Sequence, residues 1–253
     1  MIHIMNKRIN SIPVLEVVQA DKANKALPTV IYYHGFTGEK ESSLTIAYKI
    51  AQNGQRVILP DSYLHGERHD SSVKADLELS FWNIVMKNIN ELKEIKTYLL
   101  EHKLADSDRI GIGGTSMGGI TTYGALRTYP WIKAAVVLMG TAKMTDYAKM
   151  LIDHYNKQNE TPIKQETADE VLDMLQGYDI SLDPEMLHSR PLFIWHGEED
   201  KVVPFKLSKM FYEEIEYLYK KNDHIKFLPE KNRSHHISKT SIAETAKWFQ
   251  TFL

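Results

Sequence analysis

The sequence predicts an α/β protein with a mostly parallel sheet of roughly eight strands and helices on both of its faces. Three observations lead to this prediction. Short β-branched runs recur along the 253 residues, turn signals end each run, and helical patterns separate most of the runs. Strands that alternate with helices are typical of right-handed crossovers, which produce a parallel sheet.

Seven segments have the composition of buried strands, and residues 2–9 are a weaker eighth candidate. The seven are Val14–Val18, Thr29–Tyr33, Arg56–Leu59, Arg109–Ile112, Ala135–Met139, Leu192–Trp195 and Ile225–Leu228. The first two strands have no helix between them. We therefore expect them to form an antiparallel hairpin at one edge of the sheet.

The clearest helical pattern runs from about Leu79 to Leu100, where apolar side chains recur at three- and four-residue steps. A different pattern follows the strand that ends near Gly140. About fifty residues there contain two helical patterns, 143–156 and 167–175, and no convincing strand. Because an insertion of this length is expected to be functional, we predict one domain over residues 1–253 with a helical cap inserted at 141–188.

Composition excludes several classes of function. Lys and Arg number 31 against 33 Asp and Glu, a net charge of −2, which provides no basic field for nucleic acid. Cys is absent, which excludes disulfides, thiolate metal sites and a Cys nucleophile and fits a cytoplasmic location. The N-terminal residues lack a signal-peptide pattern, and the apolar run Ala134–Met139 is too short to span a membrane. We therefore expect neither a nucleic-acid partner nor a membrane anchor.

A candidate nucleophile follows the strand Arg109–Ile112. Gly114, Ser116 and Gly118 form the pattern G-x-S-x-G, which predicts a sharp strand-to-helix turn that exposes the serine hydroxyl. Two alternatives are weaker. Ser116 could serve only as a helix N-cap, and a dinucleotide loop would need a third glycine at Ser116 and an acidic residue within 131–136.

A serine nucleophile needs a base and an orienting carboxylate. Asp200 lies in the turn after the strand Leu192–Trp195 and is the predicted acid, with Glu198 as the alternative. His235 lies in the loop after the strand Ile225–Leu228 and is the predicted base, with His236 as the alternative. All three loops belong to the carboxyl edge of a parallel sheet, so they are expected to meet there.

Two backbone N–H groups are expected to bind the oxyanion. They belong to Phe36, in the turn after the strand Thr29–Tyr33, and to Met117, directly after the nucleophile. Tyr147 and Met150 in the cap are the predicted substrate-binding residues, although ordinary helix packing explains them equally well. His65 and His69 have metal-like spacing, but Gly66 disfavours a helix there and no Glu follows His65, so no metal is predicted.

These motifs resemble the α/β-hydrolase superfamily, and most closely the small bacterial serine esterases related to dienelactone hydrolases and to prolyl oligopeptidase catalytic domains. The resemblance is carried by residues 34–36, 114–118, 196–204 and 234–235, and by the loop 61–68. One departure is Ser234, where the family often has Gly, and this weakens the choice of His235 over His236. The Ser nucleophile argues against true dienelactone hydrolases, which use Cys.

The resemblance implies an α/β-hydrolase fold and an enzyme that cleaves small to medium carboxylic esters through an acyl-enzyme. Its expected partner is a small-molecule ester, and no cofactor is expected. A peptidase or acylaminoacyl hydrolase is the alternative activity. A non-catalytic binding relative is a third possibility, although such relatives usually lose a triad member and none is missing here.

Overall fold

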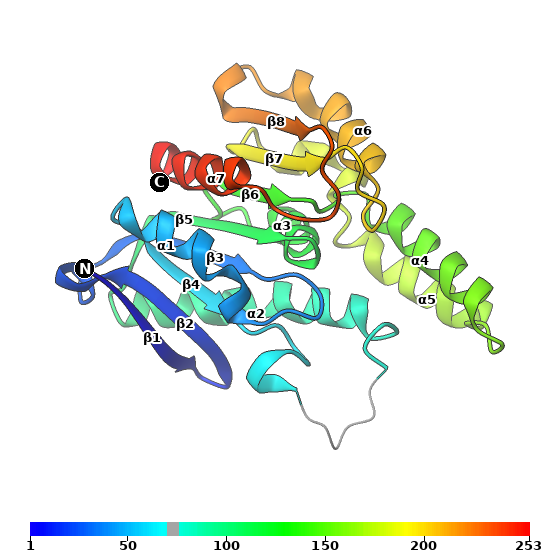
Figure 1. Cartoon of the computed structure of the whole chain (residues 1–253), viewed down its shortest axis with the longest axis horizontal. Helices are drawn as coiled ribbons and strands as arrows, with labels where there is room; N and C mark the ends of the chain where they lie inside the picture. Colours follow the sequence, from blue (N-terminus) through cyan, green and yellow to red (C-terminus); the bar gives the residue numbers. More distant parts are fainter. Residues whose placement is uncertain (70–75) are drawn as a thin grey trace.

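The computed structural model describes residues 1–69 and 76–253, which form an eight-stranded sheet covered by helices on both faces (Figure 1). The strands are β1 (Ile2–Ile9), β2 (Ile12–Gln19), β3 (Leu27–Tyr33), β4 (Arg56–Pro60), β5 (Ala105–Thr115), β6 (Ala135–Leu138), β7 (Leu192–Gly197) and β8 (Ile225–Glu230). Their order is β1-β2-β4-β3-β5-β6-β7-β8, and every neighbouring pair from β4 to β8 is parallel. The predicted fold class is confirmed.

The expected hairpin between Val14–Val18 and Thr29–Tyr33 is wrong: the antiparallel hairpin at the sheet edge consists of β1 and β2, and β2 pairs antiparallel with β4 and not with β3. β3 follows β2 without an α-helix between them, yet it lies between β4 and β5. Most residues of β1 are exposed or half-buried, whereas β2 is buried almost throughout. An edge strand with one solvated side carries polar residues there, and His3, Asn6, Lys7 and Arg8 interrupt the apolar pattern that would mark residues 2–9 as a strand.

Two layers of helices enclose the sheet. The helices α1 (Leu44–Gln52) and α7 (Lys239–Phe252) pack on one face, while α2 (Phe81–Glu101), α3 (Met117–Thr128) and α6 (Phe205–Ile215) pack on the other. The predicted apolar stripe of α2 is buried from Trp82 to Leu99, as expected for a helix that covers a sheet. None of the helices in the described residues is long and apolar enough to cross a bilayer.

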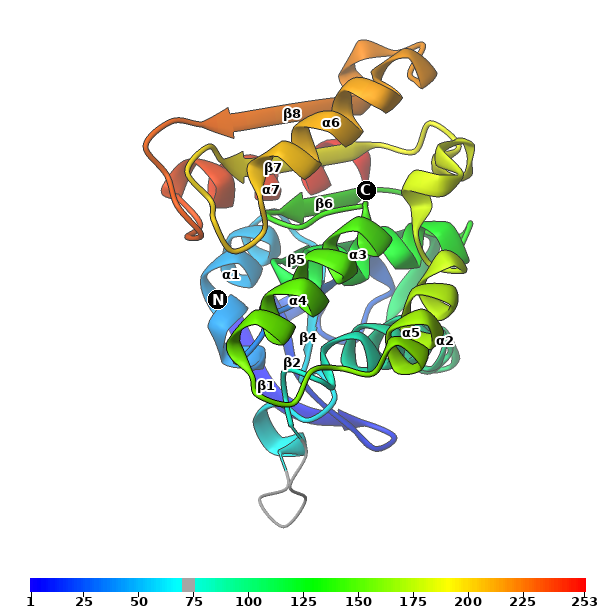
Figure 2. The same cartoon turned by 90° about the vertical axis from the view of Figure 1, so that its right-hand side faces the viewer.

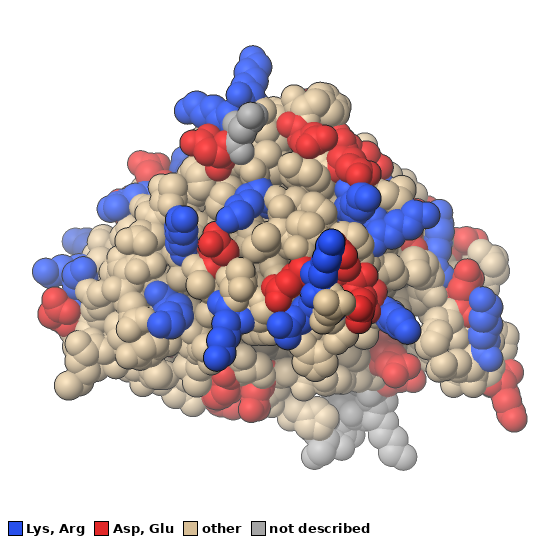
Figure 3. Space-filling view, turned by 45° about the horizontal axis from the view of Figure 1, so that its top comes forward, with Lys and Arg blue, Asp and Glu red and all other residues tan. Residues whose placement is uncertain are grey.

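Two helices, α4 (Met144–Gln158) and α5 (Gln165–Gln176), lie between β6 and β7, followed by two 3₁₀ turns. Figure 2 shows α4 in front of the edge where the parallel strands end. Leu175, Ile180 and Leu187 from this region are buried in the main core. The segment therefore contributes to the core as well as covering the edge. Figure 3 shows Lys and Arg side chains interspersed with Asp and Glu side chains over one face of the molecule.

Candidate active site

Ser116 lies at the turn between β5 and α3, with a backbone φ of 55° and ψ of −115°. This conformation is costly for a residue with a side chain, so the surrounding structure must hold it. The Ser116 N–H donates to Leu138 O at 2.8 Å. A Cβ on Gly118 would lie 2.2 Å from Tyr33 O, so only glycine allows β3 and α3 to approach this closely. The predicted strained turn is therefore present.

His235 reaches the serine from the loop after β8. Its Nε2 lies 2.8 Å from Ser116 Oγ, and the two residues are 119 positions apart in the chain. The loop is anchored by Glu230, whose Oε2 accepts hydrogen bonds from Trp195 Nε1 at 2.9 Å and from Ser238 Oγ at 2.6 Å. His236, the alternative base, is exposed and its Nδ1 lies 3.4 Å from Ser234 Oγ. The structure thus brings His235, and not His236, to Ser116.

Asp200 completes a line of hydrogen bonds from the serine. Its Oδ2 accepts from His235 Nδ1 at 2.6 Å, and its Oδ1 accepts from the N–H groups of Val202 and Val203 at 2.9 and 3.1 Å. The Asp200 side chain is fully buried, whereas the alternative acid Glu198 is exposed. The protein thus offers one carboxylate, not two, to the histidine.

A second histidine, His196 at the end of β7, also contacts Asp200. Its Nε2 lies 3.1 Å from Asp200 Oδ2 and 2.9 Å from Val203 O, so this nitrogen donates. Burial alone would raise the pKa of Asp200, but the hydrogen bonds from His196 and His235 outweigh it and hold that pKa well below its usual range. Asp200 is therefore ionised at neutral pH.

The two candidate oxyanion donors lie on either side of the serine turn. A Cβ built on Gly35 would lie 3.5 Å from Ser116 Cβ, which places the Phe36 loop directly beside the nucleophile. Met117 is the first residue of α3, where N–H groups have no partner within the helix. Among the described residues, neither the Phe36 nor the Met117 N–H donates a hydrogen bond. Both are thus available to a developing negative charge.

An aromatic wall, defined as Phe36, Phe81, Trp82 and Tyr147, lies next to this site. Phe81 packs edge-on against Phe36, Trp82 and Tyr147, with ring centroids 5.4, 5.0 and 6.4 Å apart. The Tyr147 hydroxyl donates to Val202 O at 3.2 Å in the Asp200 loop. Burial and the charge of Asp200 raise the pKa of Tyr147 to about 12. The wall therefore joins the Phe36 loop, the start of α2 and the cap helix α4.

The two predicted substrate-binding residues differ in their surroundings. Tyr147 is buried in the aromatic wall, whereas Met150, one turn further along α4, is 45% exposed. The sequence pattern could not separate them, because both lie on the same apolar face of the predicted helix. Of these two residues, Tyr147 is the one that hydrogen-bonds to the loop of the candidate acid Asp200.

No group of three or more His, Cys, Asp or Glu side chains in residues 1–69 and 76–253 is arranged to hold a metal. His65 directs both ring nitrogens at the backbone: Nδ1 lies 2.9 Å from Tyr63 O, and Nε2 accepts from Thr37 N at 3.0 Å. The segment Gly66–Arg68 after it forms a 3₁₀ turn. His65 is thus engaged in joining two loops.

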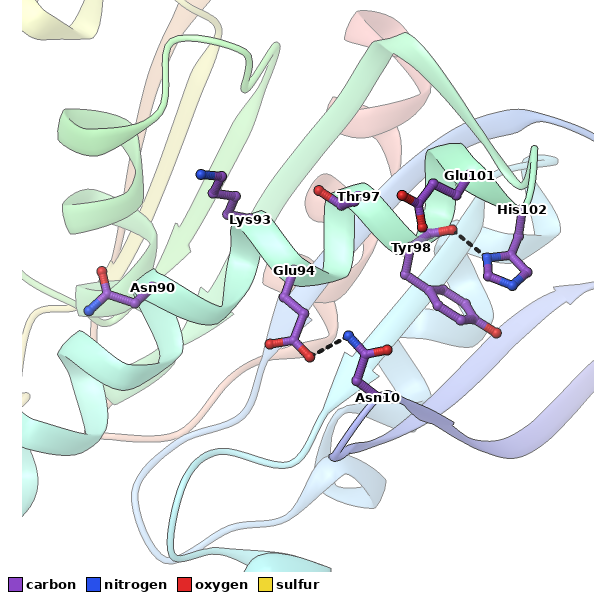
Figure 4. A pocket seen from close by; sticks show the side chains of 8 residues that line it. All are labelled: Asn10, Asn90, Lys93, Glu94, Thr97, Tyr98, Glu101 and His102. Carbon is purple, nitrogen blue, oxygen red and sulfur yellow. Dashed lines mark hydrogen bonds between the residues drawn. The ribbon is translucent and has the colours of Figure 1, made fainter.

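A surface hollow of about 590 Å³ lies along the C-terminal half of α2 (Figure 4). Asn10 Nδ2 donates to Glu94 Oε1 at 2.6 Å there, and the rings of Tyr98 and His102 stack 4.0 Å apart. At 1.5 Å per residue, His102 lies about 30 Å along the helix from Phe81. The hollow therefore belongs to the junction of the β1–β2 turn with α2 and not to the serine site.

Sequence reasoning did not single out His196, His34, Phe81 or Trp82 as site residues. A signal exists for His196, because it lies four residues before Asp200 within the segment 196–204. His34 lies in the segment 34–36, and Trp82 belongs to the apolar stripe of α2. Their roles depend on which loops lie side by side, which no local pattern records.

Comparisons with known proteins agree with this architecture. The family model described as "Prolyl oligopeptidase family" matches residues 86–253. The chain is 40% identical over 255 residues, covering all of both proteins, to the "Putative esterase YitV" of Bacillus subtilis (strain 168). It is 32% identical over 204 residues, 81% of each chain, to the "Esterase YjfP" of Escherichia coli (strain K12). The crystal structure of TT1662 from Thermus thermophilus has a TM-score of 0.75 at 16% identity, covering 99% of this chain and 98% of that one, which shows a shared fold.

Proposed function

Because this chain belongs to the prolyl oligopeptidase family of α/β-hydrolases, we propose that it cleaves carboxylic esters of small to medium acyl chains through an acyl-enzyme. It is a serine hydrolase of the esterase and peptidase branch. The observation that carries acyl-enzyme catalysis is the continuous line of hydrogen bonds from Ser116 through His235 to Asp200, at 2.8 and 2.6 Å. The choice of esters is supported by the two relatives that are named as esterases.

In the proposed reaction, His235 Nε2 takes the proton from Ser116 Oγ as the oxygen attacks the ester carbonyl. The His235 Nδ1–H donates to Asp200, which holds this tautomer and stabilises the imidazolium that forms. The tetrahedral oxyanion accepts hydrogen bonds from the Phe36 and Met117 N–H groups. Collapse breaks the ester C–O bond, and His235 returns the proton to the departing alcohol.

The second half of the reaction uses the same groups. His235 removes a proton from a water molecule, whose oxygen attacks the acyl-enzyme carbonyl, and Ser116 leaves as the alcohol once reprotonated. Neither half needs a cofactor. The carboxylic acid is released and the free enzyme is regenerated.

The aromatic wall supports a limit on acyl size. Phe81 and Trp82 come from α2, and Tyr147 comes from α4 in front of the sheet edge, so an acyl chain bound beside Ser116 is bounded by rings held in place by one another. Side chains packed edge-on yield little space without losing their mutual contacts. We therefore propose small and medium acyl groups as substrates.

Amide hydrolysis is the second candidate, because the family model that matches is named for oligopeptidases. The same triad cleaves amides when the leaving amine is bound and protonated. The non-catalytic alternative is weakened, because Ser116, His235 and Asp200 are all present and hydrogen-bonded to one another.

The test is a panel of p-nitrophenyl esters with acyl chains of increasing length, compared with aminoacyl p-nitroanilides of matched side chains. We expect kcat/KM to be highest for short and medium esters and at least about 100-fold lower for the anilides. Comparable or higher kcat/KM on the anilides would replace the proposal with a peptidase. No turnover of either set, with no phosphonate labelling of Ser116, would favour the binding relative.

A further inference from the structure

Two loops at the carboxyl edge of the sheet are bonded to each other beside the nucleophile. We define the oxyanion loop as residues 34–40, after β3, and the support loop as residues 61–67, after β4. The Ser62 N–H donates to His34 Nε2 at 3.0 Å, and the Thr37 N–H donates to His65 Nε2 at 3.0 Å. Each loop thus supplies one histidine whose Nε2 accepts a hydrogen bond from a backbone N–H of the other loop.

The far end of the oxyanion loop is held by charge. Asp61 is fully buried, and its two carboxylate oxygens accept from the backbone N–H and the Nζ of Lys40, both at 2.9 Å. Lys40 is 3% exposed, and hydrogen bonds to Glu67 and Asp61 raise its pKa against the opposing effect of burial. Breaking a buried pair of this kind leaves an uncompensated charge, so this end of the loop is firmly attached.

The peptide that carries the Phe36 N–H is oriented from its carbonyl side. Gly35 O accepts from His34 Nδ1 at 2.7 Å and from the Gly38 N–H at 3.1 Å. A trans peptide is planar, with its N–H opposite its C=O. The hydrogen bonds to the Gly35 carbonyl therefore constrain the direction of the Phe36 N–H from one side, and its position also depends on the peptide that follows Phe36.

The next peptide, which begins at Phe36, is held by His65. Thr37 has a φ of 62°, a conformation that β-branched residues rarely adopt without support from their surroundings. The Thr37 N–H donates to His65 Nε2, and the His65 ring also packs edge-on against the Phe36 ring at 5.5 Å. Because His65 Nδ1 donates to Tyr63 O, the neutral ring presents Nε2 as an acceptor.

His65 itself lies in a rigid turn. The Glu67 N–H donates to Asp61 Oδ2 at 3.1 Å, which closes the support loop around the buried carboxylate. Gly66 has a φ of 53°, and a Cβ there would lie 2.1 Å from Asp61 Oδ1. The turn therefore excludes every other residue at this position and holds the imidazole of His65 at a fixed place.

From this geometry we propose that His65 is a positioning residue for the oxyanion hole, which acts by holding the Phe36–Thr37 peptide so that the Phe36 N–H faces the oxyanion formed at Ser116. This inference rests on the proposed serine hydrolase function. It assigns to the support loop a role in the reaction that does not require His65 to touch the substrate.

The test compares the rate at which a p-nitrophenyl alkylphosphonate labels Ser116 in the wild-type protein, His65→Ala, His65→Gln and His65→Asn. The probe places a phosphonyl oxygen where the oxyanion forms, and mass spectrometry follows its covalent attachment without ester turnover. The Gln Oε1 is as many bonds from Cα as His Nε2, whereas the Asn oxygen is one bond shorter. We expect labelling to slow at least about tenfold in the Ala and Asn variants and to stay within about threefold of wild type in Gln.

His69→Ala, four residues away and exposed, is the matched control and should label like the wild type. If esters are turned over, His65→Ala should lower kcat with KM within about twofold, because the hydrogen bond to the oxyanion strengthens only in the transition state. If the Ala variant does not fold, the comparison of labelling rates between the Gln and Asn variants still tests the proposal. Equal labelling rates in Gln and Asn, or a rise in KM with unchanged kcat, would overturn the proposal. Failure of ester hydrolysis with the labelling pattern intact would reject the ester substrate and keep the role of His65.

Discussion

His196 Nε2 lies 3.1 Å from Asp200 Oδ2, the same oxygen that accepts the hydrogen bond from His235 at 2.6 Å. His196 is fully buried, and its Nδ1 lies 2.8 Å from Ser208 Oγ, whose hydroxyl donates to Gly140 O at 2.7 Å. His196 of β7 therefore holds the carboxylate of the candidate triad, and it is itself held by Ser208 of α6, which is bonded to Gly140 in the loop after β6.

We expect His196→Leu to lower both activity and stability, because a buried carboxylate loses a donor. A hydrogen bond to a charged group contributes about 1.5–3 kcal/mol to the free energy of unfolding, and kcat should fall about tenfold. His196→Gln keeps an N–H donor at the same number of bonds from Cα and should lose less of both. Urea unfolding and ester kinetics measure the two effects. A Leu variant with wild-type kcat would show that His196 has no part in orienting Asp200.

Ser116→Ala should reduce ester turnover by at least about three orders of magnitude, because triad members act as a unit. The strained turn is set by the backbone of β5 and α3, so the variant should fold, as judged by circular dichroism and thermal unfolding. A serine-directed phosphonate should label the wild-type protein at Ser116 and leave the variant unlabelled. An Ala variant that keeps a tenth of the activity would mean that another residue attacks the ester.

His235→Ala should abolish turnover, while His236→Ala should keep most of it. The reason is geometric: His235 Nε2 lies 2.8 Å from Ser116 Oγ, whereas the His236 ring is exposed beside Ser234. Steady-state kinetics on one activated ester distinguish the two variants, which alter neighbouring residues of the same loop and so control for each other. The reverse pattern would move the base by one residue.

Stability should fall as the pH drops from about 6.5 to about 4, in part because of His34. Burial lowers its pKa from 6.5 to about 4, so over this range the unfolded chain binds a proton that the folded protein excludes. The contribution of neutral His34 to the free energy of unfolding is complete above pH 6.5 and is lost on acidification to about pH 4. A pKa shift of this size corresponds to about 3 kcal/mol. Asp200 also has a lowered pKa, but its effect lies below about pH 4.

Urea unfolding at a series of pH values measures this effect. The variant His34→Asn keeps a donor for Gly35 O but has no side chain that titrates at position 34. Between pH 4 and 6.5 its free energy of unfolding should therefore change less steeply with pH, and the difference in slope should correspond to about one proton taken up on unfolding. His69→Asn, at an exposed position, should keep the wild-type slope. Parallel curves for wild type and His34→Asn would contradict the assignment.

Tyr147→Ala should shift the ester preference toward longer acyl chains, because it opens the aromatic wall next to Phe81 and Trp82. The kcat/KM for an acetate ester should change less than that for a chain of about eight carbons. Tyr147→Phe keeps the ring and loses only the hydrogen bond to Val202 O, so its chain-length profile should match the wild type. Met150→Ala, at a largely exposed position, serves as the cap control. An unchanged profile in Tyr147→Ala would mean that other loops bound the acyl group.

Several features could be predicted from the sequence because they depend on residues close together in the chain. Short β-branched runs that end in turn signals identified the strands, and apolar residues at three- and four-residue steps identified α2, since side-chain direction repeats with the helical backbone. The glycines around Ser116 predicted the strained turn, because only certain residues allow that local geometry. The order of serine, acid and histidine loops, each after a strand, indicated that they meet at one edge of a parallel sheet.

Other features were decided by the tertiary structure. Glu198 and Asp200 are both acidic, and His235 and His236 are both histidines in one loop, so local pattern could not choose between them. In the folded protein Asp200 is buried and Glu198 is exposed. The loop after β8 places His235, and not His236, beside Ser116. The bonds between His34, His65 and the two loops, and the insertion of Leu175 and Leu187 into the core, depend on surfaces that meet only after folding. The sequence by itself determines the pattern of apolar residues and the turn residues of each element. The contacts between distant elements follow from how their buried faces pack together.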